Sequence, residues 1–174
     1  MPHTTAQIII PDDFPPVISR TPALQTIQAH GHVTVYTSRP ETQDELVTRI
    51  REAHTVVNIR AYCKFTAEVL QACPYLQHLA IGSTGTDNVD LAAAQAAGIV
   101  VTNTPNTATD ALAEQGLALL QEPIASDDLL LTLPNVVLSP HTAGTTPEAL
   151  MNGLNLCVAN VVAFLQGQVQ HRVV

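Results

Sequence analysis

Short apolar segments alternate with amphipathic segments over the first part of this chain. The apolar segments are rich in consecutive Val, Ile, Leu and Ala, which is typical of strands buried on both faces of a parallel sheet. We predict five such strands, at residues 7–10, 32–37, 55–59, 76–81 and 99–102.

Helices are predicted in the segments between these strands, at residues 23–30, 42–53, 66–73 and 89–97. Pro22 follows Thr21 where a helix would begin, and Gly98 stands where the fourth helix would end. This alternation favours an α/β fold, a doubly wound parallel five-stranded sheet with helices on both faces. Such an arrangement is flavodoxin-like, and its ligands lie at the carboxyl ends of the strands.

The regular alternation ends after the fifth strand. An apolar helix, a short strand and a C-terminal helix are predicted at residues 108–120, 136–138 and 147–166. We therefore divide the chain into a flavodoxin-like domain, a junction, and a return strand and helix that pack on the same domain, at residues 1–120, 121–134 and 135–174.

Composition narrows the class of protein. The 174 residues carry a formal net charge of −8, which argues against nucleic-acid binding because that needs a basic surface. No segment approaches the ~18 consecutive apolar residues of a membrane span, and residues 1–7 lack the pattern of a signal peptide. We expect a cytoplasmic protein with no membrane partner. Cys63, Cys73 and Cys157 form no C-x-x-C pair, so neither a disulfide framework nor a metal site is predicted.

The loop at residues 82–88 is the first candidate site. It follows the fourth strand, and its glycines let backbone N–H groups approach a carboxylate or phosphate. Ser83, Thr84 and Gly85 are the candidate binding residues. The alternative is a tight turn in which Asp87 or Asn88 caps the next helix.

Arg60 is the second candidate, two residues beyond Asn58 at the end of the third strand and close to Lys64. Its guanidinium would reach the same edge of the sheet, where its planar fork is suited to a carboxylate. The alternative is a solvated surface arginine.

His141 is the third candidate, in a segment of small residues after the predicted strand at 136–138. Histidine is the natural general acid or base near neutral pH, although a lone histidine also serves structural roles. The remaining histidines, including His30 and His32, have no third metal ligand in view and are interpreted as surface residues.

Missing motifs are equally informative. No two of the eight glycines are separated by one residue, so the dinucleotide fingerprint G-x-G-x-x-G does not occur. There is also no G-K-[ST], which excludes a P-loop. The first strand leads into an acidic, proline-rich loop at residues 11–16, where a flavodoxin binds the flavin phosphate, so flavin binding is not expected.

The chain resembles the D-isomer-specific 2-hydroxyacid dehydrogenases, close to the phosphoglycerate and formate dehydrogenase group. Four stretches carry the likeness: PYL at 74–76, GTDNVD at 85–90, AGIVVTNTP at 97–105 and LPNVVLSPHTAG at 133–144. In that family a complete Rossmann domain interrupts the substrate-binding domain. Here residues 113–120 look like the helix that leads into the Rossmann domain, and Glu122-Pro123 looks like the return from it. The resemblance implies a substrate-binding domain whose Rossmann domain was deleted, by engineering or naturally.

The resemblance also assigns roles. Arg60, Ser83, Thr84 and Gly85 match the contacts to the substrate carboxylate, and His141 matches the acid/base. The family's catalytic Arg, the Glu that partners the His, and the NAD-binding loop would belong to the missing domain. We therefore expect that the chain binds no cofactor, although its parent family uses NAD, and that it does not transfer hydride by itself.

The expected ligand is a small 2-oxo or 2-hydroxy carboxylate. Its affinity should be no better than about millimolar, because the crevice stays wet without the second domain. The apolar helix at 108–120 is expected to dock onto the sheet, which favours a monomer over a dimer.

Two other interpretations remain open. A receiver-like signalling module would also have Asp12 and Asp13 after its first strand, but it needs an Asp after the third strand, where this chain has Asn58 and Arg60. The other is a structural fragment of the fold that has lost ligand binding.

Overall fold

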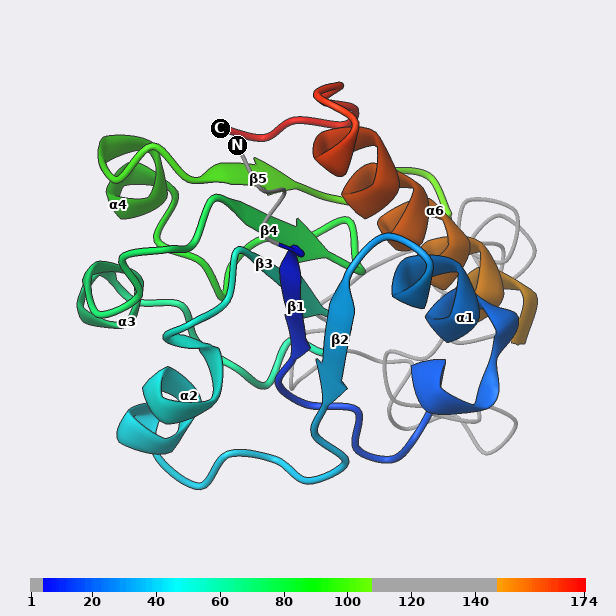
Figure 1. Ribbon diagram of the computed structural model, residues 1–174, viewed down its shortest axis with the longest axis horizontal. Helices are drawn as coiled ribbons and strands as arrows, with labels where there is room; N and C mark the ends of the chain where they lie inside the picture. The colour runs from blue at the N-terminus through cyan, green and yellow to red at the C-terminus, as the bar shows by residue number, and fades with distance from the viewer. Residues whose placement is uncertain (1–4, 108–146) are drawn as a thin grey trace, which may run out of the picture.

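The computed structural model describes residues 5–107 and 147–174, and these form a parallel sheet between two layers of helices (Figure 1). The strands are β1 (Gln7–Ile10), β2 (His32–Val35), β3 (Thr55–Asn58), β4 (His78–Ile81) and β5 (Val100–Thr102). They lie in the order β2-β1-β3-β4-β5, and every pairing between them is parallel. This is the flavodoxin-like order, so the predicted fold class is confirmed.

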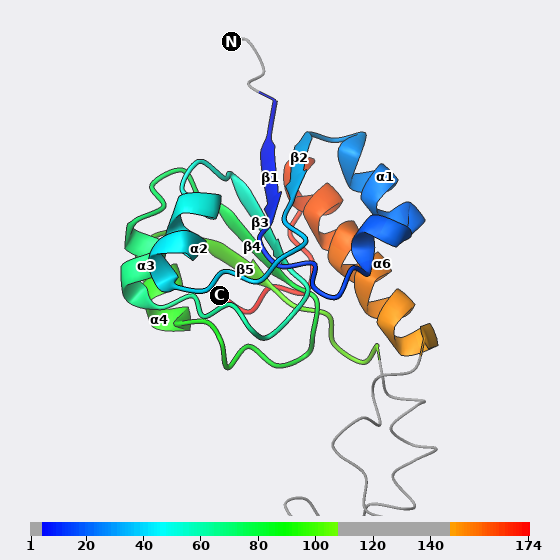
Figure 2. The same cartoon turned by 90° about the horizontal axis from the view of Figure 1, so that it is seen from below.

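Two groups of helices cover the sheet, one on each face (Figure 2). One layer contains α2 (Gln43–Ile50), α3 (Ala67–Gln71) and α4 (Leu91–Ala96). The other contains α1 (Pro22–Gln28), preceded by the 3-10 turn η1 (Ile18–Arg20), and the long helix α6 (Pro147–Leu165). The predicted helices are present among the described residues, and several are shorter than expected.

Side-chain caps define the starts of the short helices. The hydroxyls of Thr42 and Thr66 accept hydrogen bonds from the first turns of α2 and α3, and Asp90 does the same for α4. The fourth helix was predicted to begin at Val89, but Val89 instead pairs with Phe65 in an isolated parallel bridge. Gly98 follows α4 with φ +71°, as its predicted place at the end of that helix requires.

The apolar core is divided by the sheet into two clusters. Toward α2, α3 and α4 it consists mainly of aliphatic side chains, among them Leu46, Ile50, Val56, Leu70 and Leu79. Toward α1 and α6 it contains Ile8, Ile10, Val57, Leu154 and Val161. The strands contribute to both clusters because their side chains alternate between the two faces.

His78 contradicts the interpretation of the remaining histidines as surface residues. It lies on β4, is fully buried, and its ring stacks on Phe164 of α6 at 4.4 Å between centroids. Its Nε2 lies 3.0 Å from the hydroxyl of Thr102. Burial lowers the pKa of His78 to about 4, so the ring is neutral at neutral pH. His30 and His32 are exposed, as expected.

The C-terminal segment lies beside the edge strand β5. Arg172 pairs with Thr102 in an antiparallel bridge, and the N–H of Val173 donates to the carbonyl of Val101 at 2.7 Å. The final residues thus add a short antiparallel partner to an otherwise open sheet edge.

Helix α6 is long and apolar enough, by length and composition, to cross a membrane. In this fold it packs on the sheet and buries Leu154, Cys157, Val158 and Val161 there. The predicted helix at 108–120, the junction at 121–134 and the predicted strand at 136–138 lie outside the described residues.

Candidate functional site

Two of the three candidate clusters lie at the carboxyl edge of the sheet. β3 ends at Asn58 and β4 ends at Ile81, and these two residues are partners in the parallel ladder. The segments that follow therefore start side by side, and the N–H of Gly82 donates to the carbonyl of Asn58 at 2.8 Å. Arg60 and the loop 83–85 are brought to the same edge by this register.

The hydroxyl groups of the loop are used to hold its shape. Ser83 Oγ donates to the carbonyl of Gly85 at 2.9 Å, and Thr84 Oγ1 donates to the carbonyl of Thr104 at 3.2 Å. Within the described part of the chain, the backbone N–H groups of Ser83, Thr84 and Gly85 donate to no acceptor. These residues are exposed, so the loop presents free N–H donors to an anion.

A second segment fixes the loop from the side of β5. Asn103 Nδ2 donates to the carbonyl of Thr84 at 2.8 Å, and the N–H of Thr104 donates to the carbonyl of Ser83 at 3.1 Å. The sequence analysis did not identify Asn103 or Thr104. Both residues lie in the stretch 97–105 that carries the family likeness, but their contact with the loop could not be seen there, because Asn103 and its partner Thr84 are 19 positions apart along the chain.

Helix α6 extends this support. Asn160, 1% exposed, donates from Nδ2 to the carbonyl of Asn103 at 2.8 Å. Its Oδ1 lies 2.9 Å from Nδ1 of His171 in the C-terminal segment. Because the amide nitrogen is engaged with Asn103, the Asn160 oxygen accepts and the His171 nitrogen donates. A line of hydrogen bonds therefore joins the C-terminal segment, α6 and the loop 83–85.

Arg60 is half-buried and is not a freely solvated side chain. Its Nη2 donates to the carbonyl of Pro15 in the loop after β1, at 3.2 Å. Its Nε is buried and, within the described residues, has no hydrogen-bond partner. The guanidinium thus retains unused donor capacity at the carboxyl edge.

A cavity of about 180 Å³ adjoins the loop on the side of α6. We call it the α6 pocket; it is lined by Ile59, Gly82, Ser83, Thr84, Thr107, Ala149, Leu150, Gly153 and Leu154. Its polar rim comes from the loop after β4, and its apolar wall comes from α6 and Ile59.

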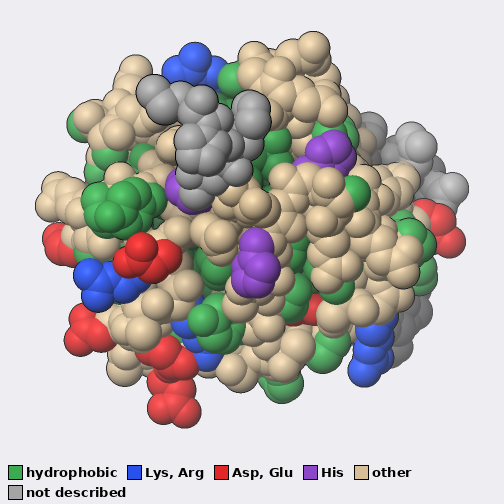
Figure 3. All heavy atoms as spheres, viewed as in Figure 1, with side chains coloured by type: hydrophobic (Ala, Val, Ile, Leu, Met, Phe, Trp, Pro, Cys, Tyr) green, Lys and Arg blue, Asp and Glu red, His purple; other side chains and the backbone are tan. Residues whose placement is uncertain are grey.

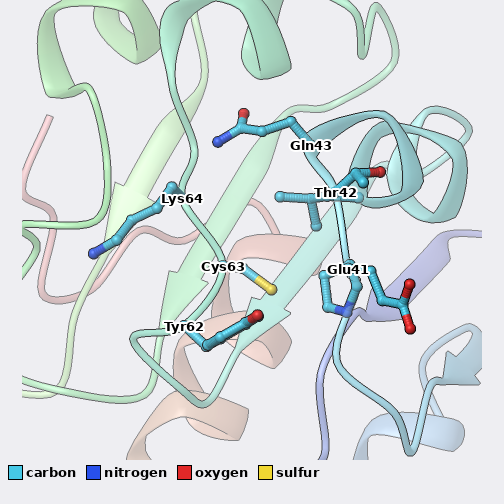
Figure 4. Close-up of a pocket in the computed structure, with 8 residues that line it drawn as sticks. Glu41, Thr42, Gln43, Tyr62, Cys63 and Lys64 are labelled. Atoms are coloured by element: carbon cyan, nitrogen blue, oxygen red, sulfur yellow. The ribbon is translucent and has the colours of Figure 1, made fainter.

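A second cavity, of about 150 Å³, lies at the start of α2 (Figure 4). We call it the α2 pocket; it is lined by Pro40, Glu41, Thr42, Gln43, Leu46, Tyr62, Cys63 and Lys64. The charged groups of Glu41 and Lys64 point to opposite sides (Figure 4). Desolvation is the main cause that raises the pKa of the Cys63 thiol to about 12, which leaves it a poor nucleophile.

The alternative interpretation of the loop 82–88, in which Asp87 or Asn88 caps the next helix, is wrong. Asp90 caps α4 by accepting from the N–H of Ala93 at 2.9 Å. Asn88 is buried and its Nδ2 donates to the carbonyl of Cys63 at 2.9 Å. Neither Asp87 nor Asn88 is the cap, and the free N–H groups of the loop remain unexplained by helix capping.

The loop after β1 does not suit the phosphate of a nucleotide. The carboxylate of Asp13 is buried there and accepts from the N–H groups of Val17, Ile18 and Ser19 at 2.7 to 3.1 Å. Those are the donors that an incoming phosphate would need. This loop also contains no glycine, so its described residues do not form the glycine-rich turn that holds a flavin or dinucleotide phosphate.

Charge is distributed unevenly over the face of the molecule seen in Figure 3. Acidic and basic side chains gather on the side of the molecule where α2 and α3 lie, as Figure 3 shows. The described residues contain no group of three or more His, Cys, Asp and Glu side chains that could hold a metal ion. His141 lies outside the described residues.

Comparison with known families gives one match that spans nearly the whole chain. Residues 13–174 match the family described as D-isomer specific 2-hydroxyacid dehydrogenase, catalytic domain.

Individual relatives match about half of the chain. Human D-3-phosphoglycerate dehydrogenase is 35% identical over 88 residues, which are 51% of this chain and 16% of that enzyme. Glyoxylate reductase of Thermofilum pendens is 34% identical over 101 residues, 57% of this chain and 30% of that enzyme. The matched part is therefore less than a third of each of these two enzymes.

The chain is also similar to solved structures. The TT0316 protein of Thermus thermophilus is 31% identical, with a TM-score of 0.52 over 66% of this chain and 35% of that protein. An acyclic imino acid reductase in complex with NADPH and D-Arg has a TM-score of 0.59 over 66% of this chain and 36% of that protein, and at 23% identity it shows the fold alone. Because residues 13–174 match the catalytic domain of the D-isomer specific 2-hydroxyacid dehydrogenase family, this chain belongs to that family.

Proposed function

We propose that this chain is the isolated substrate-binding domain of an NAD-dependent D-2-hydroxyacid dehydrogenase, with the family's Rossmann domain deleted. Its ligand would be a small 2-oxo or 2-hydroxy carboxylate. The observation that carries the proposal is the set of free N–H groups at Ser83, Thr84 and Gly85, beside a cavity and on the same edge as Arg60. Family membership sets the signalling-module interpretation aside.

Each proposed binding group has a separate task. The N–H groups of the loop 83–85 would hold one carboxylate oxygen, and the contacts from Asn103 and Thr104 keep these donors in position before the ligand arrives. Arg60 would supply the positive charge, through the donors that Pro15 does not use. His141 would accept the proton of the 2-hydroxyl group, the role that the family likeness assigns to it.

NAD, where it is bound, accepts or donates hydride at the substrate carbon. The residues of this chain do not fit that cofactor, since the sequence has no dinucleotide fingerprint and Asp13 occupies the donors after β1. We therefore assign no hydride step to this chain. Titration with NADH should give no saturable fluorescence change, and saturable micromolar binding would contradict this part of the proposal.

The carboxylate site is tested by titrating the isotope-labelled chain with pyruvate and following its amide resonances by NMR. We expect shifts at Ser83, Thr84 and Gly85 with a dissociation constant of about 1 mM, because solvent screens the charges in an open site. Removing the charge-assisted contact in Arg60→Ala should weaken binding by about tenfold or more.

The matched control is Arg51→Ala, which removes an exposed arginine whose ion pair is with its neighbour Glu52. This variant should bind pyruvate as the unchanged chain does. Shifts that map elsewhere, or equal affinity in Arg60→Ala, would support a structural fragment with no retained site.

A further inference from the structure

Gly153 occupies a place in α6 that favours another residue. It lies within a helix that runs from Pro147 to Leu165, and it is buried. Only proline is worse than glycine in a helix interior, because glycine loses the most backbone entropy. A glycine at this place therefore needs a reason.

Close contact with neighbouring atoms does not explain why residue 153 is a glycine. A Cβ atom built at Gly153 would lie 3.6 Å from the carbonyl oxygen of Gly82 and 3.7 Å from Oγ1 of Thr107, which are ordinary van der Waals distances. Gly31 shows the opposite case, since its Cβ would come within 2.6 Å of the carbonyl oxygen of Ala6. Alanine would fit at Gly153 without moving its neighbours, but it would not fit at Gly31.

What an alanine would remove is empty space in the α6 pocket. Gly153 lines that cavity together with the alkyl groups of Ile59, Leu150 and Leu154. Among the described residues that line it, none is charged. Pockets for drug-sized ligands hold about 300–1,000 Å³, so a cavity of about 180 Å³ suits a smaller group.

Ser83 and Thr84, whose backbone N–H groups donate to no acceptor among the described residues, also line this cavity. A carboxylate held by these N–H groups would have its next carbon atoms near the apolar part of the cavity. A phosphate or second carboxylate in that part would be buried without a counter-ion, which is strongly unfavourable.

We propose that the α6 pocket binds the alkyl side chain of a small 2-oxo or 2-hydroxy acid, and that Gly153 sets how long that side chain is. This inference rests on the proposed function and narrows its substrate class to acids with a short, uncharged side chain.

The test is an NMR titration of the full chain with glyoxylate, pyruvate, 2-oxobutanoate and 2-oxoglutarate. Affinity should rise from glyoxylate to 2-oxobutanoate by about fourfold for each buried carbon. The charged 2-oxoglutarate should bind more weakly than pyruvate. In Gly153→Ala, 2-oxobutanoate should lose about fourfold or more of its affinity while glyoxylate is unchanged.

Folding of the variant is checked by its melting temperature, which should rise by about 2–4 °C because alanine favours the helix. Asn152→Ala is the control, since Asn152 is an exposed neighbour on α6 outside the pocket lining. It should bind all four acids as the unchanged chain does.

The outcomes separate the two proposals. If none of the four acids binds, the proposed function fails and this inference fails with it. If glyoxylate and pyruvate bind at the loop 83–85 but affinity does not depend on side-chain length, or Gly153→Ala changes nothing, only the inference is overturned. A preference for 2-oxoglutarate would likewise overturn the inference and leave the proposed function standing.

Discussion

The two helical layers of this molecule are stabilised in different ways. Helices α2, α3 and α4 are short. Each begins at a capping residue whose side chain accepts a hydrogen bond from the backbone N–H three residues later. Their contacts to the sheet are made chiefly by aliphatic side chains.

The layer of α1 and α6 depends on contacts between distant residues. Thr21 precedes α1 but makes no side-chain cap. His78 stacks on Phe164, and Asn160 bonds to Asn103, 57 positions away. The candidate site, at the carboxyl edge of the sheet, adjoins this layer, because α6 lines the α6 pocket and bonds to Asn103. The comparison teaches that both layers use long-range polar contacts, since Arg49 of α2 donates to the carbonyl of Pro11, 38 positions away. The difference is where these contacts lead, because those of α6 reach the loop 83–85 through Asn103.

The largest expected effect is a loss of stability in acid, which arises from His78 where it packs against α6. Its pKa in the folded chain is about 4, below the ordinary 6.5, so between these values the unfolded chain binds a proton that the folded chain excludes. The free energy of unfolding should therefore be at its full value above pH 6.5 and fall by about 3 kcal/mol as the pH drops to 4.

Denaturant unfolding measured across this pH range gives the change, and an NMR titration of the imidazole gives the pKa of His78 itself. His32→Gln, which removes an exposed histidine on β2, should leave the slope unaltered. A His78 resonance that titrates near 6.5 would mean that the ring is not buried as described.

Asn160→Ala should have the next largest effect. It leaves the carbonyl of Asn103 and the Nδ1 of His171 without this partner in two part-buried hydrogen bonds. Each such bond contributes about 0.5–1.5 kcal/mol, so the loss of both costs about 1–3 kcal/mol. Because Asn103 also holds Thr84, pyruvate binding should weaken as well. Chemical unfolding and the NMR titration measure the two consequences.

Asn155→Ala is the matched control, with the same residue type exposed on the same helix. It should change stability by no more than about 0.5 kcal/mol and leave binding intact. Equal behaviour of the two asparagine variants would remove the proposed link between α6 and the loop 83–85.

Thr42→Ala should have the smallest effect and should act on the other layer. It removes the oxygen that accepts from the N–H of Glu45 at 3.1 Å, and the loss of such a cap costs about 1 kcal/mol. Pyruvate binding should not change. Thr48→Ala, at an exposed position of α2, is the control, and a change of affinity in Thr42→Ala would show that the two layers are coupled.

Much of the fold could be predicted because its signals are local. The five strands are short segments rich in Val, Ile, Leu and Ala, although β2 (HVTV) contains no buried residue, so the prediction that it is buried on both faces is wrong. The helices between them begin and end at residues with known terminal preferences, such as Thr42, Thr66 and Gly98. The errors are also local in origin. Helix α4 begins later than predicted because Asp90 rather than an earlier residue is its cap.

The candidate site was only partly predictable. Arg60 and the loop 83–85 could be placed at one edge, because parallel strands bring their carboxyl ends together. The contact of Arg60 with Pro15 and the support of Thr84 by Asn103 could not be foreseen, since each joins segments whose separation along the chain carries no pattern.

The sequence by itself determined the α/β alternation, the buried strands, the absence of a dinucleotide fingerprint and the likeness to a dehydrogenase family, because each is a matter of residue order. Only the tertiary structure decided that His78 is buried and that the Asp13 carboxylate accepts from N–H groups of the loop after β1. It also decided that Gly153 lines a cavity and is not in close contact with a neighbouring backbone. The physical reason is that burial, hydrogen-bond satisfaction and empty volume depend on what the fold places next to a residue, and that neighbour is usually far away in the chain.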